Sequence, residues 1–119
     1  MIKKNRFKAA LDGLTAVFKS ERNFKIHVFI FFLVLVFGFF FQIEIWEWIT
    51  VLFSSALVFT AEMINTAIEK LCDYVEPKRD AKIGRIKDIS ASAVFTCALI
   101  SAIVGSFVFI PYFVKLLCD

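Results

Sequence analysis

Glycine, proline, cysteine and histidine are scarce in this chain of 119 residues, which has four, two, three and one of them respectively. The glycines are dispersed and no Gly-x-x-x-x-Gly-Lys segment occurs, which excludes a Walker-type phosphate loop and the glycine-rich loop of protein kinases. The cysteines are odd in number, scattered and without metal-ligand spacing, so they indicate no disulfide framework and no metal site. Charged residues are missing from long stretches, and these stretches determine how the chain is organised.

Three long runs of residues contain no Asp, Glu, Lys or Arg, and the chain as a whole is 60% hydrophobic. A soluble domain of this size could not hide so much apolar surface, so the composition predicts a single membrane domain over residues 1–119. A helix that crosses a bilayer needs about 20 mainly apolar residues. The predicted fold is therefore an all-α membrane protein with three spans, at about residues 24–43, 48–71 and 89–114.

Residues 5–20, ahead of the first span, have a different pattern. Apolar side chains recur there at helical spacing, while polar and charged side chains occupy the other side. This pattern predicts an amphipathic helix that lies on the membrane surface. The apolar positions are Phe7, Ala10, Leu11, Leu14, Val17 and Phe18.

The segments between the spans differ in charge. Gln42–Trp48 is read as a tight turn without Lys or Arg, and Tyr74–Lys87 as a charged loop, with Pro77 ending the helix before it. Seven basic residues precede the first span, six lie in residues 70–87, and the tail has one. The positive-inside rule therefore predicts a cytoplasmic N-terminus and second loop, with the C-terminus outside.

A polar stripe marks the end of the second span. Glu62, Asn65, Glu69 and Asp73 are spaced i, i+3, i+7 and i+11, which places them within an arc of about 100° on a helix. The stripe would run from membrane depth to the water surface. An ionisable group at such depth costs about 2.5–3.5 kcal/mol or more, which makes these residues candidates for a functional site.

The predicted topology brings several charged groups to the same side of the membrane. Glu21 lies where the surface helix meets the first span, Glu69 and Asp73 lie at the inner end of the second span, and Lys87-Asp88 opens the third. Two carboxylates that face each other at such an interface would form a hard-oxygen site for Mg²⁺, together with water and phosphate oxygens. Lys87 and the basic loop would neutralise phosphates, and Glu62 would act as a general base toward a lipid hydroxyl. This layout suits phosphoryl transfer. The alternative interpretation is that the stripe joins helices to one another inside an oligomer.

Three segments carry a resemblance to a known family. The chain resembles the small bacterial membrane kinases of the diacylglycerol kinase/undecaprenol kinase family, and the resemblance covers nearly its whole length. The segments are Glu21-Arg22-Asn23-Phe24-Lys25-Ile26-His27, Ala61-Glu62-Met63-Ile64-Asn65-Thr66-Ala67-Ile68-Glu69 and Lys87-Asp88. The resemblance implies a surface helix plus three spans in the cytoplasmic (inner) membrane, assembled as a homotrimer with active sites shared between neighbouring subunits. It also implies ATP as co-substrate and Mg²⁺ as cofactor, with no nucleic-acid partner.

The resemblance also implies roles for single residues. Glu62 matches the family's catalytic carboxylate, and Glu21 and Glu69 match the carboxylates that hold the metal bound to ATP. The residues that match the lining of the nucleotide site are Asn65, Asp73, Lys87 and Asp88. The family's loop commonly offers a Glu and a His to the nucleotide, whereas the matching places here are Lys78 and Asp80, so no loop contact to adenosine is expected.

The expected reaction is transfer of the γ-phosphate of MgATP to undecaprenol, which gives undecaprenyl phosphate. Diacylglycerol as acceptor, giving phosphatidate, is the close alternative. An alternative from another class is a non-catalytic oligomeric membrane protein in which Glu62 lines a proton or cation pathway. The single histidine, His27, is interpreted as an interfacial residue rather than a ligand.

Overall fold

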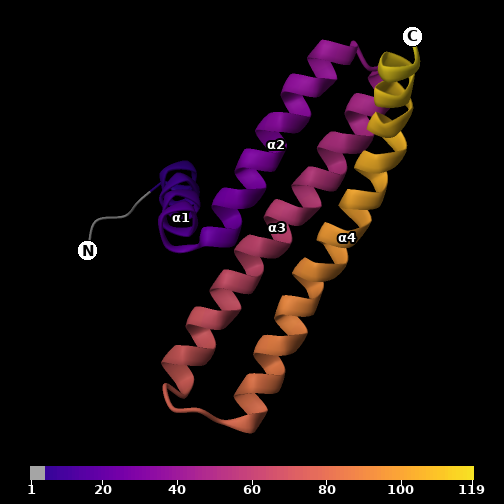
Figure 1. The fold of residues 1–119 in the computed structure, drawn as a ribbon. Coiled ribbons are helices and arrows are strands. Elements are labelled where there is room, and N and C mark those ends of the chain that lie inside the picture. Colours follow the sequence, from indigo (N-terminus) through magenta and orange to yellow (C-terminus); the bar gives the residue numbers. More distant parts are fainter. Residues whose placement is uncertain (1–4) are drawn as a thin grey trace.

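The computed structural model describes residues 5–119, and within them it contains four helices and no strand. Figure 1 shows a short helix beside three long ones. The prediction of an all-helical protein with three long apolar helices is confirmed. Two basic residues of the predicted N-terminal segment, Lys3 and Lys4, lie outside the described residues. The helices are α1 (Arg6–Ser20), α2 (Arg22–Phe41), α3 (Ile45–Val75) and α4 (Ala81–Cys118).

Helix α1 projects from the side of the three long helices (Figure 1). It begins at Asn5, whose side-chain oxygen accepts a hydrogen bond from the Lys8 amide at 2.6 Å and so caps the first turn. None of its residues is buried, and the large apolar side chains Phe7, Leu11 and Phe18 are exposed. The predicted helix over residues 5–20 is therefore present. Its position on a membrane surface stays a prediction.

The turn between α2 and α3 is shorter than the predicted one. Gln42 ends α2 in the left-handed conformation, with φ 52°, and the Ile43 amide donates to the Gly38 carbonyl at 3.1 Å. Helix α3 then begins at Ile45, three residues before the predicted start of the span. The reason is a capping box, in which the Glu44 and Glu47 side chains each accept a hydrogen bond from the other residue's backbone amide.

The connection between α3 and α4 is also short. Helix α3 ends at Val75, just before Pro77 as predicted, but only residues 76–80 are non-helical. The Asp80 carboxylate accepts a hydrogen bond from the Ile83 amide at 3.1 Å and starts α4 at Ala81. The predicted loop up to Lys87 was too long, because its charged residues belong to a helix that extends beyond the apolar part of the bundle.

Helix α4 is long enough to leave a bilayer at both ends. It has 38 residues and continues through Pro111 to Cys118, past the predicted end at residue 114. At about 1.5 Å per residue it measures about 57 Å, compared with about 30 Å for the hydrocarbon core. The helix therefore carries charged residues of its first turns, such as Arg85 and Lys87, outside the apolar region.

The best-packed part of the protomer lies where the α2–α3 turn meets the end of α4. Ile43, Val51 and Val108 are buried there, with the rings of Trp48 and Tyr112 packed against them. Gly38 lets Trp48 approach closely, because a Cβ atom at this position would lie 2.4 Å from the Trp48 ring. Elsewhere α3 packs mainly along α4.

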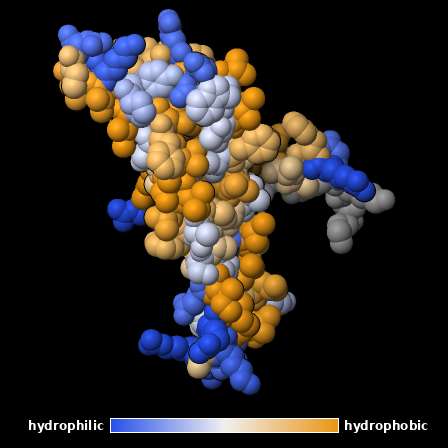
Figure 2. Space-filling model, turned by 90° about the vertical axis from the view of Figure 1, so that its right-hand side faces the viewer, coloured by the Kyte–Doolittle hydropathy of each residue, from blue (hydrophilic) through white to orange (hydrophobic). Residues whose placement is uncertain are grey.

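Large apolar side chains are exposed along all three long helices of the single protomer. Phe29 and Phe32 on α2, Phe53 on α3 and Phe107 on α4 are each more than 60% exposed. Figure 2 shows apolar residues over much of the body, with hydrophilic residues gathered at its two ends and on the protruding arm of α1. This distribution is the one expected of an integral membrane protein, because a lipid environment accepts apolar surface that water does not.

Candidate active site

The deepest polar residue of the stripe, Glu62, is buried, with 4% of its surface exposed. Its backbone carbonyl accepts a hydrogen bond from Thr66 Oγ1 at 2.9 Å, one turn further along α3. The carboxylate itself faces α2, where His27 Nε2 lies 3.1 Å from Glu62 Oε1. A buried carboxylate next to an imidazole is thus the central feature of the site.

Aromatic packing fixes α2 against α3 at this level. Phe24 is buried, and its ring centroid lies 5.5 Å from that of Phe59. Phe31 packs on the same Phe59 ring, also with centroids 5.5 Å apart. His27 lies between the two α2 phenylalanines and Glu62 lies one turn after Phe59, so this packing brings the imidazole and the carboxylate together.

Asn65 and Glu69 continue the stripe toward the polar end of α3. Asn65 Nδ2 donates a hydrogen bond to Glu69 Oε1 at 3.2 Å. The remaining oxygen of the amide, Asn65 Oδ1, is buried and accepts no hydrogen bond from residues 5–119. A buried acceptor without a partner costs about 1–3 kcal/mol, so a water, an ion or another ligand is expected to bind it.

Glu21 reaches the same region from a different element. It lies between α1 and α2, as predicted, and is both the C-cap residue of α1 and the N-cap residue of α2. Glu21 and Glu69 are each close enough to Glu62 for their charges to interact with it. A common site formed by the three acidic residues stays a prediction.

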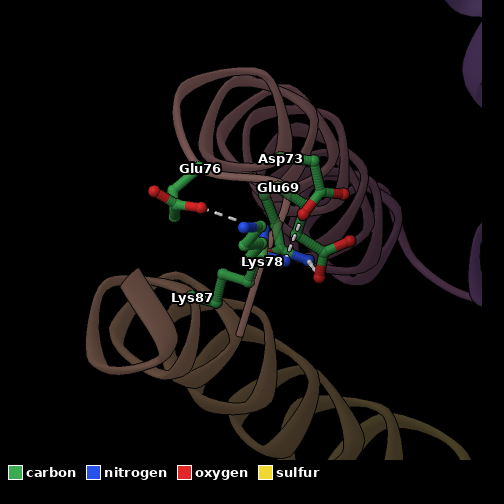
Figure 3. A network of polar contacts seen from close by, with 6 residues as sticks. Glu69, Asp73, Glu76, Lys78 and Lys87 are labelled. Carbon is green, nitrogen blue, oxygen red and sulfur yellow. Dashed lines mark hydrogen bonds and ion pairs between the residues drawn. The ribbon is translucent and has the colours of Figure 1, made fainter. Parts of the chain in front are cut away.

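The outer part of the stripe contacts α4. Lys87 Nζ forms an ion pair with Asp73 Oδ1, and Figure 3 shows the lysine approaching the acidic side chains of α3 from the neighbouring helix. Asp88, the next residue, instead lines an open hollow with Arg85 and Ser92 on α4. The structure thus joins Lys87 to the stripe and directs Asp88 elsewhere within the protomer.

The loop residues Lys78 and Asp80 each take part in a local hydrogen bond. The Lys78 amide donates to Glu76 Oε1 at 3.1 Å, which closes the connection on itself (Figure 3). Asp80 uses its carboxylate to cap α4. The backbone amide of Lys78 and the carboxylate of Asp80 thus each have a hydrogen-bond partner in the chain itself.

The donor atoms suit a magnesium ion only in part. Glu21, Glu69 and Asn65 offer hard oxygen atoms, the type that Mg²⁺ prefers, and the unpartnered Asn65 Oδ1 fits such a ligand. Within the described part of the chain, however, no group of three or more His, Cys, Asp or Glu residues is arranged to hold a metal. These oxygen atoms therefore suit a Mg²⁺ ion that keeps several of its waters and is held partly by the phosphates of the substrate.

An apolar cavity adjoins the pair formed by the buried Glu62 and the half-buried His27. It has a volume of about 210 Å³ and lies between α2, α3 and α4, with His27 in its wall. The other lining residues include Phe31 and Val34 on α2, Ser55 on α3 and Gly105 on α4. A long apolar chain attached to a polar group would match this combination of cavity and carboxylate.

The family model of prokaryotic diacylglycerol kinase matches residues 8–109 of the chain. The chain belongs to this family. It is 34% identical to an undecaprenol kinase of Bacillus subtilis over 99 residues, which cover 83% of this chain and 80% of that protein. A diacylglycerol kinase of Haemophilus influenzae is 32% identical over 100 residues, or 84% and 85% of the two chains. A diacylglycerol kinase of Synechocystis is 30% identical over 112 residues, which cover 93% of this chain but 64% of that longer protein.

The protein is thus an integral-membrane lipid kinase, a phosphotransferase with an alcohol acceptor. Kinases of this kind use ATP and generally need a divalent metal. The alternative of a non-catalytic pathway protein is set aside by the family membership. Sequence reasoning found the acidic stripe but missed the contact of His27 with Glu62, because the pairing joins two helices 35 residues apart and leaves no pattern within either of them.

Proposed function

We propose that this kinase transfers the γ-phosphate of MgATP to undecaprenol at the cytoplasmic leaflet, which gives undecaprenyl phosphate and ADP. The observation that carries the proposal is the buried carboxylate of Glu62, which lies beside an apolar cavity and heads a stripe of polar groups. The 34% identity to a relative named undecaprenol kinase favours the polyprenyl acceptor. The relatives named diacylglycerol kinase keep diacylglycerol as the second candidate.

In the proposed reaction Glu62 is the catalytic residue. Its free oxygen, Oε2, takes the proton from the primary hydroxyl of the lipid as the hydroxyl oxygen attacks the γ-phosphorus. The new P–O bond forms on one side while the bond to the β-phosphate oxygen breaks on the other, and ADP leaves with that electron pair. General-base catalysis of this kind contributes about 10²–10⁴-fold to a rate.

The other residues of the stripe hold the nucleotide. Glu21 and Glu69 are the proposed carboxylate ligands of Mg²⁺, and Asn65 adds its free amide oxygen. When bound, the ion would neutralise charge on the phosphate oxygens during transfer. Asp73, Lys87 and Asp88 are the proposed polar lining of the nucleotide site. Lys87 suits the phosphates in particular, because its ammonium group lies at the edge of the stripe.

Assembly and orientation belong to the same proposal. Counts of basic residues favour a cytoplasmic N-terminus and α3–α4 connection, with the C-terminus outside. The described acidic residues of one chain offer fewer metal ligands than a complete site needs, which supports an oligomer in which neighbouring subunits complete each active site. The proposed number of subunits, three, comes from the family resemblance.

The decisive experiment compares the two acceptors. Purified kinase in detergent, supplied with MgATP, is expected to phosphorylate undecaprenol with a higher kcat/KM than diacylglycerol, as measured by radiolabelled phosphate in the lipid fraction. ATP consumption without a lipid alcohol should stay at background. A higher kcat/KM with diacylglycerol would replace the proposed acceptor with the second candidate.

A further inference from the structure

The carboxylate of Glu62 has one hydrogen-bonding group of another helix beside it, the imidazole of His27. The 3.1 Å distance joins His27 Nε2 on α2 to Glu62 Oε1 on α3. The side chain of Glu62 is 5% exposed and that of His27 is 23% exposed, so water screens the pair little. A charge-assisted contact in such a place orients both partners more strongly than one at the surface.

No other polar group in the described part of the chain takes over this task. The Thr66 hydroxyl donates its hydrogen bond to the backbone carbonyl of Glu62 and not to the carboxylate. Asn65 directs its amide nitrogen at Glu69. Within the described residues Glu62 Oε1 accepts no hydrogen bond of standard geometry, and its ion-pair contact with His27 Nε2 at 3.1 Å is the one polar contact that it has there. The charges of Glu21 and Glu69 repel that of Glu62. The orientation of the carboxylate therefore depends on the imidazole.

The imidazole is itself held in register. Phe24 and Phe31, three residues before and four after His27, both pack on the Phe59 ring of α3. Rotation of α2 about its axis would break both aromatic contacts. The backbone of His27 is consequently held relative to α3, with its side chain next to Glu62 and in the wall of the apolar cavity.

We propose that His27 is the positioning residue of the kinase reaction: it holds Glu62 Oε1 so that Oε2 faces the lipid hydroxyl. The proposal rests on the proposed role of Glu62 as the base. In this role the Nε2 hydrogen stays on His27 and is directed at Oε1, and the proton of the acceptor hydroxyl goes to Oε2, so no proton is exchanged between the two side chains. Because His27 also lines the cavity, it orients the base toward a hydroxyl whose apolar chain enters there.

Two amide variants separate this role from simple packing. In His27→Gln the side-chain nitrogen reaches about as far as imidazole Nε2, whereas in His27→Asn it stops one methylene short. Both variants are uncharged and have the same polar group, so they form a matched pair. The kinetics of both are measured with undecaprenol and MgATP, together with Glu62→Gln and the double variant Glu62→Gln/His27→Asn. Thermal unfolding in detergent gives the stability of each.

We expect His27→Asn to lower kcat about 10- to 100-fold, because a misplaced catalytic group costs rates of this order. His27→Gln should stay within about threefold of the wild type, and the KM for MgATP should change less than about twofold in both, since nucleotide binding is left intact. The double variant should be no slower than Glu62→Gln alone, because His27 acts only through Glu62.

Equal rates for His27→Asn and the wild type would overturn the proposal, and so would equal losses for Asn and Gln. An additive loss in the double variant would also contradict it, since His27 would then act independently of Glu62. Failure of the underlying function has a different signature, namely undiminished turnover in Glu62→Gln. If His27→Asn does not fold, His27→Gln tests the proposal by itself. A loss of more than about tenfold in its kcat would then refute the proposal.

Discussion

Helix α3 contains two buried glutamates, and they differ in how completely the protein satisfies them. Glu47 near the start of the helix is 6% exposed and accepts hydrogen bonds from the Glu44 amide at 3.0 Å and from the Tyr112 hydroxyl of α4. Glu62, just past the middle of the helix, is 4% exposed and has only the neighbouring imidazole. A buried carboxylate that accepts two hydrogen bonds stabilises a fold, whereas one without such donors retains the capacity to bind and react.

The surroundings of the two residues differ in the same way. Near Glu47 the close approach of Gly38 and Trp48 and the buried Val51 leave little space. Near Glu62 there is a cavity of about 210 Å³, and Asn65 Oδ1 is buried without a partner. One end of the bundle is tightly packed, and the other contains the cavity in which substrates are proposed to bind. Substitutions at either end are expected to leave the other end unaffected.

Among substitutions outside the proposed catalytic base, the largest effect is expected from Glu69→Gln at the open end. Loss of a proposed metal ligand should lower kcat/KM by about 10²–10³-fold, because metal-bound charge stabilisation is worth several kcal/mol. The oligomer should remain intact, since the side chain is partly exposed and its partner Asn65 can still bond to an amide. Turnover and size-exclusion profiles check this. If the variant dissociates while its assembled fraction keeps full activity, Glu69 is a structural contact between helices.

The next effect is expected from Gly38→Ala at the packed end. The new Cβ would lie 2.4 Å from the Trp48 ring, and overpacking of this kind costs about 1–3 kcal/mol. The kcat of the folded fraction should not change. Gly13→Ala is the matched control, because a Cβ atom at that helical position on α1 would meet nothing within 4 Å. Denaturant titration in detergent measures both, and equal midpoints for the two variants would contradict the close contact.

The smallest effect is expected from Tyr112→Phe. It removes one donor to the buried Glu47 carboxylate and should lower the free energy of unfolding by about 1–2 kcal/mol, without a change in kcat. Tyr74→Phe provides the control, since Tyr74 is 88% exposed and should tolerate the change. A loss of kcat in Tyr112→Phe at unchanged stability would show that the two ends are not separate.

The sequence predicted the helices well because their causes are local. Uncharged runs indicated three long helices, and Pro77 correctly marked the end of α3. The wrong predictions concern the ends of the helices, because charged segments there were interpreted as loops. Asp80 starts α4 well before Lys87, and the Glu44–Glu47 capping box starts α3 before Trp48. A charged segment stays helical where it has left the membrane, and no rule of periodicity shows where the apolar region ends.

The site was predictable only along single helices. The spacing from Glu62 to Asp73 gave one stripe, and the structure keeps it, with Asn65 bonded to Glu69. Contacts between helices were hidden, because the pairing of His27 with Glu62 and that of Tyr112 with Glu47 depend on how the helices pack. The acidic groups were therefore predictable from the sequence, and the residues of other helices that contact them were not.

The most direct test compares Glu62→Gln with Glu47→Gln in the same assay. We expect Glu62→Gln to lower kcat with undecaprenol by about 10³-fold, because the base is lost, at nearly unchanged stability. Glu47→Gln should keep kcat within about threefold and lower the free energy of unfolding by about 1–2 kcal/mol, because an amide replaces a paired carboxylate. The reverse result, with an active Glu62→Gln and an inactive but stable Glu47→Gln, would contradict the assignment of catalysis to the open end of the bundle.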